Sequence, residues 1–268
     1  MTTEVTATTS RAIRAVGDQA KLWASLFLFA LLGLSWSVMA IPAYLLLPRQ
    51  LGSRIGRLGF NRLICLYLSW LTLIGAYRLD LSGMDALRRG PAVILAPNHP
   101  SMIDALLILS VHPRMVCVMK SVLKNNLILG FGVRLARHIS NHPPRRMVLE
   151  AVAELQRGQS LLLFPEGTRT ISAPVNSFTT SAGLIAKRAK VAVQTLIVET
   201  DSPFLSKGWS PFHRPVLPIT FRIRLGRRFD PPENVRAFDE LLAAYFRTEL
   251  AGALQNVWLN ERHPHTPD

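Results

Sequence analysis

Apolar positions form one long uninterrupted block near the N-terminus and short, recurring runs afterwards. No charged residue occurs within residues 22–48, and this length exceeds the roughly 20 residues that a helix needs to cross a bilayer. We therefore predict a membrane helix there. Pro42 would kink or shorten it, so the helix either stops near Ile41 or the segment enters the membrane and turns back. A cleaved signal peptide ending at residues 38–40 is the weaker alternative, because acidic residues precede the block.

A second apolar stretch, residues 63–77, is too short to span a bilayer. Its apolar side chains recur at helical spacing, with Arg57 and Arg62 before it and Arg78 after it. An ordinary core helix would show the same periodicity. The neighbouring membrane segment and the arginines favour an amphipathic helix that lies in the membrane interface.

Beyond residue 77, short apolar runs alternate with amphipathic runs. The apolar runs predict β-strands at residues 78–81, 92–96, 115–119, 160–164, 191–198 and 220–225. The amphipathic runs predict helices at residues 101–110, 147–157, 179–189 and 234–254. This alternation is typical of an α/β fold with a largely parallel sheet flanked by helices, in which active groups lie in the turns after strand ends. The N-terminal membrane helix and the interfacial amphipathic helix precede this fold.

These elements divide the chain into four parts. Residues 1–21 form a polar N-terminal lead, 22–76 a membrane-anchoring helical region, 77–256 a single α/β domain and 257–268 a polar tail. Within the α/β domain, the proline-rich and aromatic segment 202–218 is predicted to be a long surface loop that serves as a membrane contact or a lid.

Composition narrows the possible partners. A chain of 268 residues with 49% hydrophobic content can bury one sizeable core plus a membrane element. The formal net charge of +14 indicates an anionic partner. Nucleic acid is not expected, because the sequence lacks zinc-finger, RNA-recognition and basic-zipper signatures, and anionic lipid headgroups fit better. Cys65 and Cys117 lie in separate apolar runs without a Cys/His cluster, so we expect neither a disulfide nor a metal site.

Candidate chemistry begins with His99 and Asp104, which follow the predicted strand at 92–96. A histidine with a carboxylate five positions on can act as a general base whose second ring nitrogen is held by the acid. On one regular helix the two side chains would lie about 140° apart. They can pair only if His99 lies in a turn and the helix starts near Ser101, which suits an N-cap. No enzyme nucleophile is needed, because an acceptor hydroxyl can take that place.

The run Phe-Pro-Glu-Gly-Thr-Arg at residues 164–169 follows an all-apolar strand in the same way. Six matched positions at the end of a strand are far more specific than a histidine and an aspartate alone. The two runs together indicate an acyl transfer site.

Both runs resemble the lysophosphatidic acid acyltransferase family of glycerolipid acyltransferases, and the resemblance extends over residues 77–225. The first family block is matched by Asn98, His99 and Asp104, and the third by residues 164–169. The resemblance implies transfer of a fatty acyl group from an acyl thioester to a hydroxyl of a lysophospholipid or glycerol phosphate. It also implies that His99 is the base and that Asp104 orients it. The third block, which binds the acceptor near its phosphate, supplies Glu166, Gly167, Thr168 and Arg169.

Other family positions are matched less fully. Lys120 and two further residues fit the second block, but Leu127 stands where proline is expected. Arg145 or Arg146 can supply the cation of the segment that follows. Residues 191–196 lack both prolines of the fourth block. These departures leave the chemistry intact and leave the acceptor open.

The mechanism implied by these residues uses no cofactor and no metal, with acyl-CoA or acyl carrier protein thioester as co-substrate. His99 takes the proton of the acceptor hydroxyl, whose oxygen attacks the thioester carbonyl. Backbone N–H groups around Gly167 or at the start of the next helix are expected to stabilise the oxyanion. Arg169 and Lys120 are the best candidates to hold the acceptor phosphate. Glu166 is expected to orient Arg169 or to bind the glycerol backbone, and a surface glutamate without such a role is the alternative.

Three functions stay open. The favoured one is a membrane-bound enzyme that acylates lysophosphatidic acid to phosphatidic acid in phospholipid biosynthesis. The second keeps the chemistry but uses another lysolipid or a specialised lipid acceptor, and the third is a non-catalytic membrane protein that binds lipids. We expect a bacterial inner membrane location with the catalytic domain on the cytoplasmic side. The expected partners are membrane phospholipids, the lysophospholipid acceptor and the thioester donor, whereas acyl chain length, donor type and oligomeric state stay undetermined.

Overall fold

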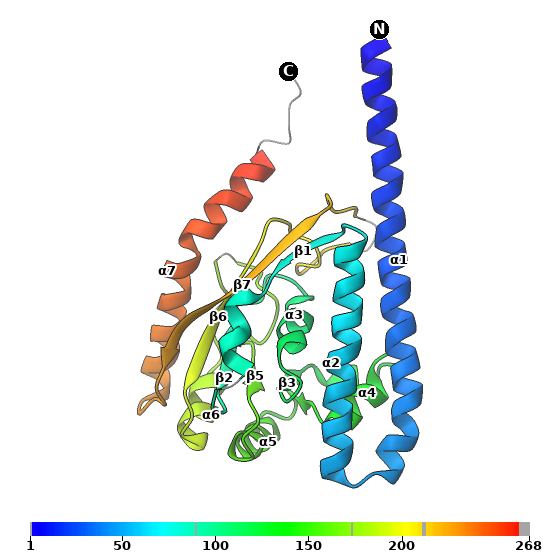
Figure 1. Cartoon of the computed structure of the whole chain (residues 1–268). Coiled ribbons are helices and arrows are strands. Elements are labelled where there is room, and N and C mark those ends of the chain that lie inside the picture. The colour runs from blue at the N-terminus through cyan, green and yellow to red at the C-terminus, as the bar shows by residue number, and fades with distance from the viewer. Residues whose placement is uncertain (1, 89, 173, 211–212, 263–268) are drawn as a thin grey trace.

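The computed structural model describes residues 2–88, 90–172, 174–210 and 213–262, and it places a seven-stranded sheet among helices (Figure 1). The strands are β1 (Tyr77–Asp80), β2 (Ile94–Pro97), β3 (Val116–Met119), β4 (Ile139–Ser140), β5 (Leu161–Leu162), β6 (Val193–Thr200) and β7 (Ile219–Phe229). Six of them overlap the predicted strands. The seventh, β4, was not predicted, because two residues are too few to show a periodic pattern.

The sheet is largely parallel, as the alternation of strands and helices predicted. Its strand order is β1-β7-β6-β2-β5-β3-β4. Among the described strands, only the pair of β6 and β7 runs antiparallel. The α/β fold class is therefore confirmed.

Helices cover both faces of this sheet. They are α1 (Thr2–Leu46), α2 (Arg49–Leu73), α3 (Asp104–Val111), α4 (Gly130–Ala136), α5 (Pro144–Gln156), α6 (Ser181–Ala189) and α7 (Val235–Arg262), with the 3-10 helices η1 (Ser82–Arg88) and η2 (Ser121–Asn125). The final helix was predicted to end at residue 254, yet it continues through the first part of the predicted polar tail. Residues 263–268 of that tail lie outside the described residues.

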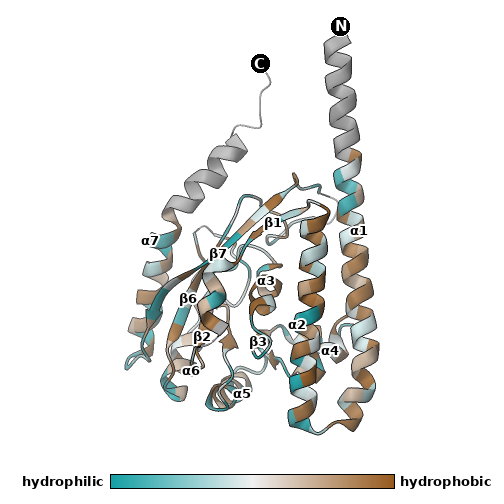
Figure 2. Ribbon diagram, in the orientation of Figure 1, coloured by the Kyte–Doolittle hydropathy of each residue, from teal (hydrophilic) through white to brown (hydrophobic). Residues whose placement is uncertain are grey.

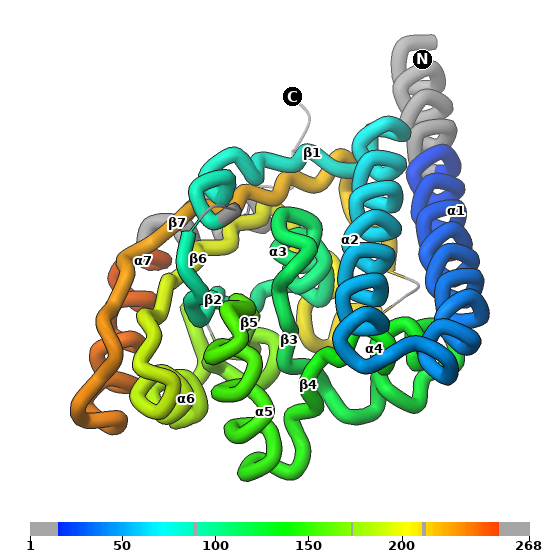
Figure 3. The backbone as a smooth tube through the Cα atoms, turned by 60° about the horizontal axis from the view of Figure 1, so that its bottom comes forward, coloured from blue at the N-terminus to red at the C-terminus, as the bar shows by residue number. Residues whose placement is uncertain are grey.

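Two hydrophobic cores lie on opposite faces of the sheet. Along β2, Leu95 belongs to the core shared with α2 and α3, whereas Ile94 and Ala96 belong to the core shared with α5, α6 and α7. This alternation follows from the two-residue period of a strand. Figure 3 shows the two groups of helices on either side of the sheet.

The helices α1 and α2 form an antiparallel hairpin that packs along one side of the α/β domain (Figure 1). The first helix continues through Pro42 to Leu46, so the expectation that it stops near Ile41 is wrong. The second begins at Arg49 rather than near residue 63. Figure 2 shows that α1 is largely hydrophobic beyond its N-terminal part, whereas α2 carries both hydrophobic and hydrophilic positions. Within the described residues, the segment Val16–Leu46 is the one helix long and apolar enough to cross a membrane.

The parallel strands direct their following loops to one edge of the sheet. The turn after β2 carries His99, and the segment after β5 carries Glu166. Helix α3 begins at Asp104, so the expected N-cap at Ser101 is wrong. The Ser101 hydroxyl instead donates a hydrogen bond to the carbonyl of Phe204, at 2.8 Å. This bond ties the β2 turn to the long loop between β6 and β7.

Candidate active site

His99 and Asp104 pair at the start of α3. Nδ1 of His99 lies 3.0 Å from Oδ2 of Asp104, because His99 occupies the turn after β2 and Asp104 opens the helix. The side chain of His99 is 15% exposed, whereas that of Asp104 is fully buried. Within the described residues, Nε2 of His99 has no hydrogen-bond partner. The imidazole is therefore held at one nitrogen and open at the other, which is the geometry that a general base needs.

Asp104 is held in place by the turn that it closes. Its Oδ2 also accepts a hydrogen bond from the backbone N–H of Ser101, at 2.8 Å. Its Oδ1 is buried and has no partner in the described part of the chain. Burial raises the pKa of the Asp104 carboxyl group above its usual value, while His99, the Ser101 N–H and the charge of Arg169 favour the ionised form.

The ring of His99 is fixed from a second direction by Phe164. The two rings are stacked, with centroids 3.8 Å apart and planes 25° apart. Phe164 lies two residues after the end of β5, so the third sequence block touches the imidazole itself. Asn98 fixes the backbone before the histidine, because its carboxamide exchanges two hydrogen bonds with the main chain of Val198. These positions belong to the matched blocks, but the sequence did not indicate what they contact.

Glu166 joins the two loops of the site. Its Oε1 accepts a hydrogen bond from the backbone N–H of His99 at 3.1 Å, and its Oε2 accepts one from the backbone N–H of Asn176 at 2.8 Å. The hydroxyl of Thr170 lies within hydrogen-bond distance of both oxygens. Burial raises the pKa of Glu166, and these hydrogen bonds partly offset that rise. The expectation that Glu166 orients Arg169 is therefore wrong, because its two carboxylate oxygens accept hydrogen bonds from other residues instead.

Asn176 organises the loop that follows the third block. Its Oδ1 accepts hydrogen bonds from the backbone N–H groups of Ile171 and Ser172, and its Nδ2 donates to the carbonyl of Arg169. A further backbone bond, from Thr170 N–H to the carbonyl of His99 at 2.8 Å, joins this loop to the β2 turn. Sequence reasoning missed Asn176, because an asparagine in a loop carries no periodic or motif signal.

Arg169 reaches across the site to the loop between β6 and β7. Its Nη1 donates to the carbonyls of Leu205 and Ser206, each at 2.8 Å. Nε and Nη2 are left without a hydrogen-bond partner in the described residues. The chain turns sharply before the arginine at Gly167, whose φ of +67° is the left-handed conformation that favours glycine. Thr168, between them, is half-buried.

Lys120 and Arg145 lie farther along the same edge of the sheet. Lys120 precedes η2 after β3, and Arg145 lies in the first turn of α5 after β4. Both side chains are exposed. Because β5 separates β3 from β2 in the sheet, neither residue contacts His99 or Asp104 within the described hydrogen-bond network. The structure thus brings four of the predicted residues into one network and leaves these two at its periphery.

No group of three or more His, Cys, Asp or Glu side chains in the described part of the chain is arranged to hold a metal ion. That the reaction needs neither a metal nor a cofactor stays a prediction.

The comparison with known families decides what kind of site this is. The family model described as acyltransferase matches residues 78–199, which contain both loops of the site. Residues 78–199 are therefore similar to the acyltransferase family. The resemblance to lysophosphatidic acid acyltransferases that the sequence blocks indicated is confirmed.

Two relatives illustrate the similarity. A 1-acyl-sn-glycerol-3-phosphate acyltransferase of Pseudomonas aeruginosa is 23% identical over 185 residues, which cover 66% of this chain and 70% of the relative. The crystal structure of the 1-acyl-sn-glycerophosphate acyltransferase PlsC from Thermotoga maritima superposes with a TM-score of 0.68 at 18% identity. That superposition covers 89% of this chain and 97% of the other, so the fold is shared along nearly the whole length.

Proposed function

We propose that this acyltransferase transfers a fatty acyl group from an acyl thioester to the hydroxyl of lysophosphatidic acid and releases phosphatidic acid for phospholipid synthesis. The observation that carries this proposal is the His99–Asp104 pair, with Nε2 of the imidazole open beside a loop that ends in Arg169. The names of both relatives support the choice of acceptor.

In the proposed reaction, Nε2 of His99 removes the proton from the acceptor hydroxyl. The oxygen attacks the thioester carbonyl carbon, a C–O bond forms, and the C–S bond then breaks. The proton held by His99 passes to the leaving thiolate, so the enzyme returns to its starting state. Asp104 stabilises the imidazolium between these steps, because the two groups lie 3.0 Å apart in a site shielded from water.

The oxyanion donors can be narrowed from the hydrogen bonds already made. The N–H of Gly167 donates to the carbonyl of Phe164, and the N–H of Met102 donates to that of Leu205. These groups are therefore engaged in the fold. The backbone N–H groups of Thr168 and Arg169 have no acceptor among the described residues, so we assign the oxyanion to them.

The acceptor phosphate is assigned to Arg169. Two backbone carbonyls hold Nη1, which leaves Nε and Nη2 in the planar fork that matches two phosphate oxygens. Lys120 and Arg145 supply further positive charge along the same edge. Either acyl-CoA or an acyl carrier protein thioester fits this arrangement as the donor.

The test is steady-state kinetics of the purified full chain with lysophosphatidic acid and both thioester donors, following thiol release and phosphatidic acid. Arg169→Lys is expected to lower kcat/KM for lysophosphatidic acid at least about tenfold, because lysine cannot make the two-point contact. Arg228→Lys, at an exposed position of β7, is the matched control and should change little. Equal losses on a phosphate-free lysolipid would contradict the phosphate assignment. If the enzyme turned over only another lysolipid, that lysolipid would replace lysophosphatidic acid as the proposed acceptor.

We also propose that the α1–α2 hairpin lies in one leaflet of a bacterial inner membrane instead of spanning it, with the α/β domain on the cytoplasmic side. Both relatives are bacterial. The hydroxyl of Ser37 donates to the carbonyl of Ile128 at 2.7 Å, and Tyr44 packs edge-on against Phe131. The C-terminal half of α1 is therefore fixed to the segment before and within α4.

That segment is too polar for the hydrocarbon core. Lys124 and Arg134 flank it, and a spanning α1 would carry them to the depth where each charge costs about 2.5–3.5 kcal/mol or more. A flat hairpin avoids this cost and still buries the apolar stripe that α1 turns away from the domain. The stripe comprises Trp23, Phe27, Leu31, Leu34, Val38 and Leu45.

Cysteine accessibility in sealed membranes tests the topology. In a Cys65→Ser background, Asp18→Cys and Gln50→Cys flank the charge-free segment at residues 22–48, while Cys117 is buried. A flat hairpin predicts that a membrane-impermeant thiol reagent reaches both positions from the side of the catalytic domain. Labelling from opposite sides would show that α1 spans.

A further inference from the structure

The exposed apolar side chains outside the α-helices are not scattered over the molecule. Among the described residues they number five, and each is between 56% and 86% exposed. They are Met102, Val122, Leu127, Ile171 and Val216. Single exposed apolar residues are common on protein surfaces, so their placement carries the argument rather than their existence.

All five lie in loops at the active-site edge of the sheet. Met102 follows β2, Val122 and Leu127 follow β3, Ile171 follows β5, and Val216 lies between β6 and β7. The described connections at the opposite edge expose no large apolar side chain. They comprise residues 81–88, 90–93, 112–115, 137–138, 157–160, 190–192 and 230–234.

The same loops carry positive charge. Lys120 and Lys124 flank Val122, and Lys207 and Arg214 lie in the loop that contains Val216. The acidic residues of these loops are Asp201, which accepts the N–H of Thr220, and the buried Glu166. Apolar tips surrounded by unbalanced cations are the combination that favours an anionic lipid surface, since the tips enter the interface while the cations attract headgroups.

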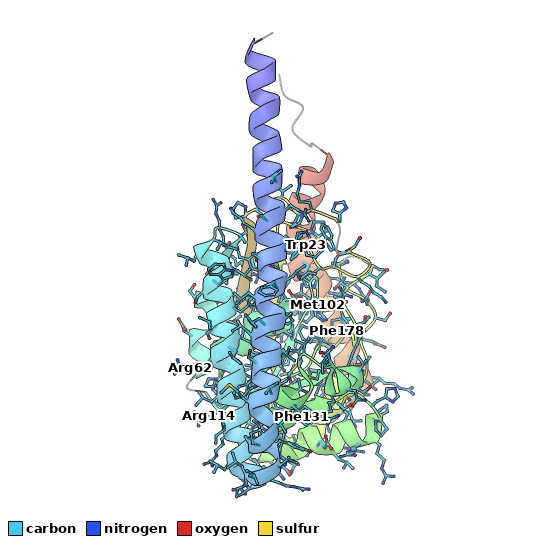
Figure 4. The ribbon with its side chains drawn as sticks, turned by 90° about the vertical axis from the view of Figure 1, so that its right-hand side faces the viewer. Trp23, Arg62, Met102, Arg114, Phe131 and Phe178 are labelled. Atoms are coloured by element: carbon cyan, nitrogen blue, oxygen red, sulfur yellow. The ribbon has the colours of Figure 1, made fainter. Side chains whose placement is uncertain are left out.

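The loop that carries Leu127 also contacts α1, the helix that bears the exposed apolar stripe. Leu127 directly precedes Ile128, whose side chain packs against α1 at Gly33, where the absence of a side chain leaves room for it. Leu129 then lines a small apolar cavity together with Trp36 of α1 and Leu106 of α3. Figure 4 views the molecule from the side that α1 covers and labels Trp23 of α1, Phe131 of α4 and Met102.

We propose that the loops around the active site form a second membrane contact, in which Leu127, Val216 and the three other apolar tips enter an anionic bilayer. The acceptor then passes from the leaflet to His99 without crossing water. The surface rests on the proposed function only in its choice of a lipid partner, and its test requires no turnover.

The experiment measures the depth of single labels on the full chain. An environment-sensitive fluorophore is attached to Leu127→Cys or Val216→Cys in a Cys65→Ser background, and vesicles of phosphatidylcholine and phosphatidylglycerol are added. Leu149→Cys on α5 and Leu241→Cys on α7 are matched controls, because these leucines are 55% and 49% exposed but lie on α-helices rather than in the loops. Leu31→Cys on α1 reports that the protein is bound.

We expect the labels at 127 and 216 to shift to shorter emission wavelengths and to lose quenching by aqueous iodide, as the label at 31 does. The labels at 149 and 241 should keep both properties. Vesicles of phosphatidylcholine alone should give a smaller shift at 127 than the anionic vesicles do. Loop labels that stay as accessible as those at 149 and 241, while the label at 31 is protected, would overturn the second contact.

Two further outcomes also decide against the proposal. If acyl carrier protein without vesicles protects the loop labels and vesicles do not, the surface docks an acidic protein instead of a membrane. If no label changes, including the one at 31, both membrane assignments fail. Loss of acyl transfer with intact label protection would leave this surface standing and would remove only the proposed reaction.

Discussion

Replacement of Asp104 by asparagine separates catalysis from folding at this site. In the wild type, Oδ2 accepts hydrogen bonds from the His99 ring and from the Ser101 N–H, while Oδ1 has no partner in the described residues. The amide oxygen of an asparagine can take the place of Oδ2 and keep both bonds. Its NH2 group then takes the place of Oδ1. Asp104→Asn therefore keeps both hydrogen bonds and removes the negative charge, and its NH2 group replaces an oxygen that already has no partner in the described residues.

The expected size of the effect follows from the charge pair that the proposed reaction creates. When His99 takes the acceptor proton, its imidazolium faces the Asp104 carboxylate across 3.0 Å between the nearest atoms. Unit charges about 4 Å apart at an effective dielectric of about 20 attract by about 4 kcal/mol. Loss of that attraction in the transition state corresponds to a fall of about 10³-fold in kcat. Thermal stability should not fall, because burial disfavours the ionised carboxyl group that is removed.

The assay compares kcat and the unfolding temperature of Asp104→Asn with those of the wild type in the same detergent or vesicles. Asp230→Asn is the matched control, since Asp230 is an exposed aspartate just after β7. A folded Asp104→Asn enzyme with near-normal turnover would refute the role of the charge. Parallel loss of activity and of several degrees in unfolding temperature would refute the separation of catalysis from folding.

Three further outcomes follow from buried or half-buried ionisable groups. In Glu166→Gln, the amide NH2 group must face one of the backbone N–H donors that now bind the carboxylate. We therefore expect a loss of about 1–3 kcal/mol in the free energy of unfolding, together with lower turnover. Unchanged thermal unfolding would contradict this expectation. Burial lowers the pKa of His138 from 6.5 to about 3. Because the folded state resists protonation of this ring, the free energy of unfolding should fall as pH decreases from about 6.5 toward 3. His138→Asn keeps an acceptor for the N–H of Cys117 and should flatten that pH dependence when unfolding is measured across pH. Burial raises the pKa of Asp239 to about 6. Its protonated carboxyl group therefore favours the folded state at low pH, and this contribution is lost as pH rises from about 4 through 6. Asp239→Asn should raise the unfolding temperature at pH 7 more than at pH 4, and the reverse order would contradict the raised pKa.

The sheet could be predicted from the sequence because its strands are short apolar runs separated by amphipathic helices. Strand β2 illustrates this, since Ile94, Leu95 and Ala96 are all buried, with neighbours alternating between the two cores. The two-residue strand β4 carries no such pattern. Its place is set by partner strand β3, and pairing between distant segments leaves no local trace in the sequence.

The pairing of His99 with Asp104 could also be predicted, because its geometry depends on local chain direction. The requirement that His99 lie in a turn before a helix followed from the five-residue spacing, and the structure has that arrangement. The starting residue of the helix could not be predicted in the same way. Ser101 has the chemistry of an N-cap, but its hydroxyl binds the carbonyl of Phe204, more than a hundred residues along the chain.

Glu166 and Arg169 show why nearness in sequence misleads within a loop. Glu166 was expected to orient Arg169, three residues along the chain, or to bind the glycerol backbone. The positive φ at Gly167 turns the chain between them, so the carboxylate faces the backbone of His99 and Asn176 while the guanidinium faces the carbonyls of Leu205 and Ser206. Each side chain thereby joins the third block to a different loop. These long-range bonds converge on the site, and no single sequence block reveals where they end.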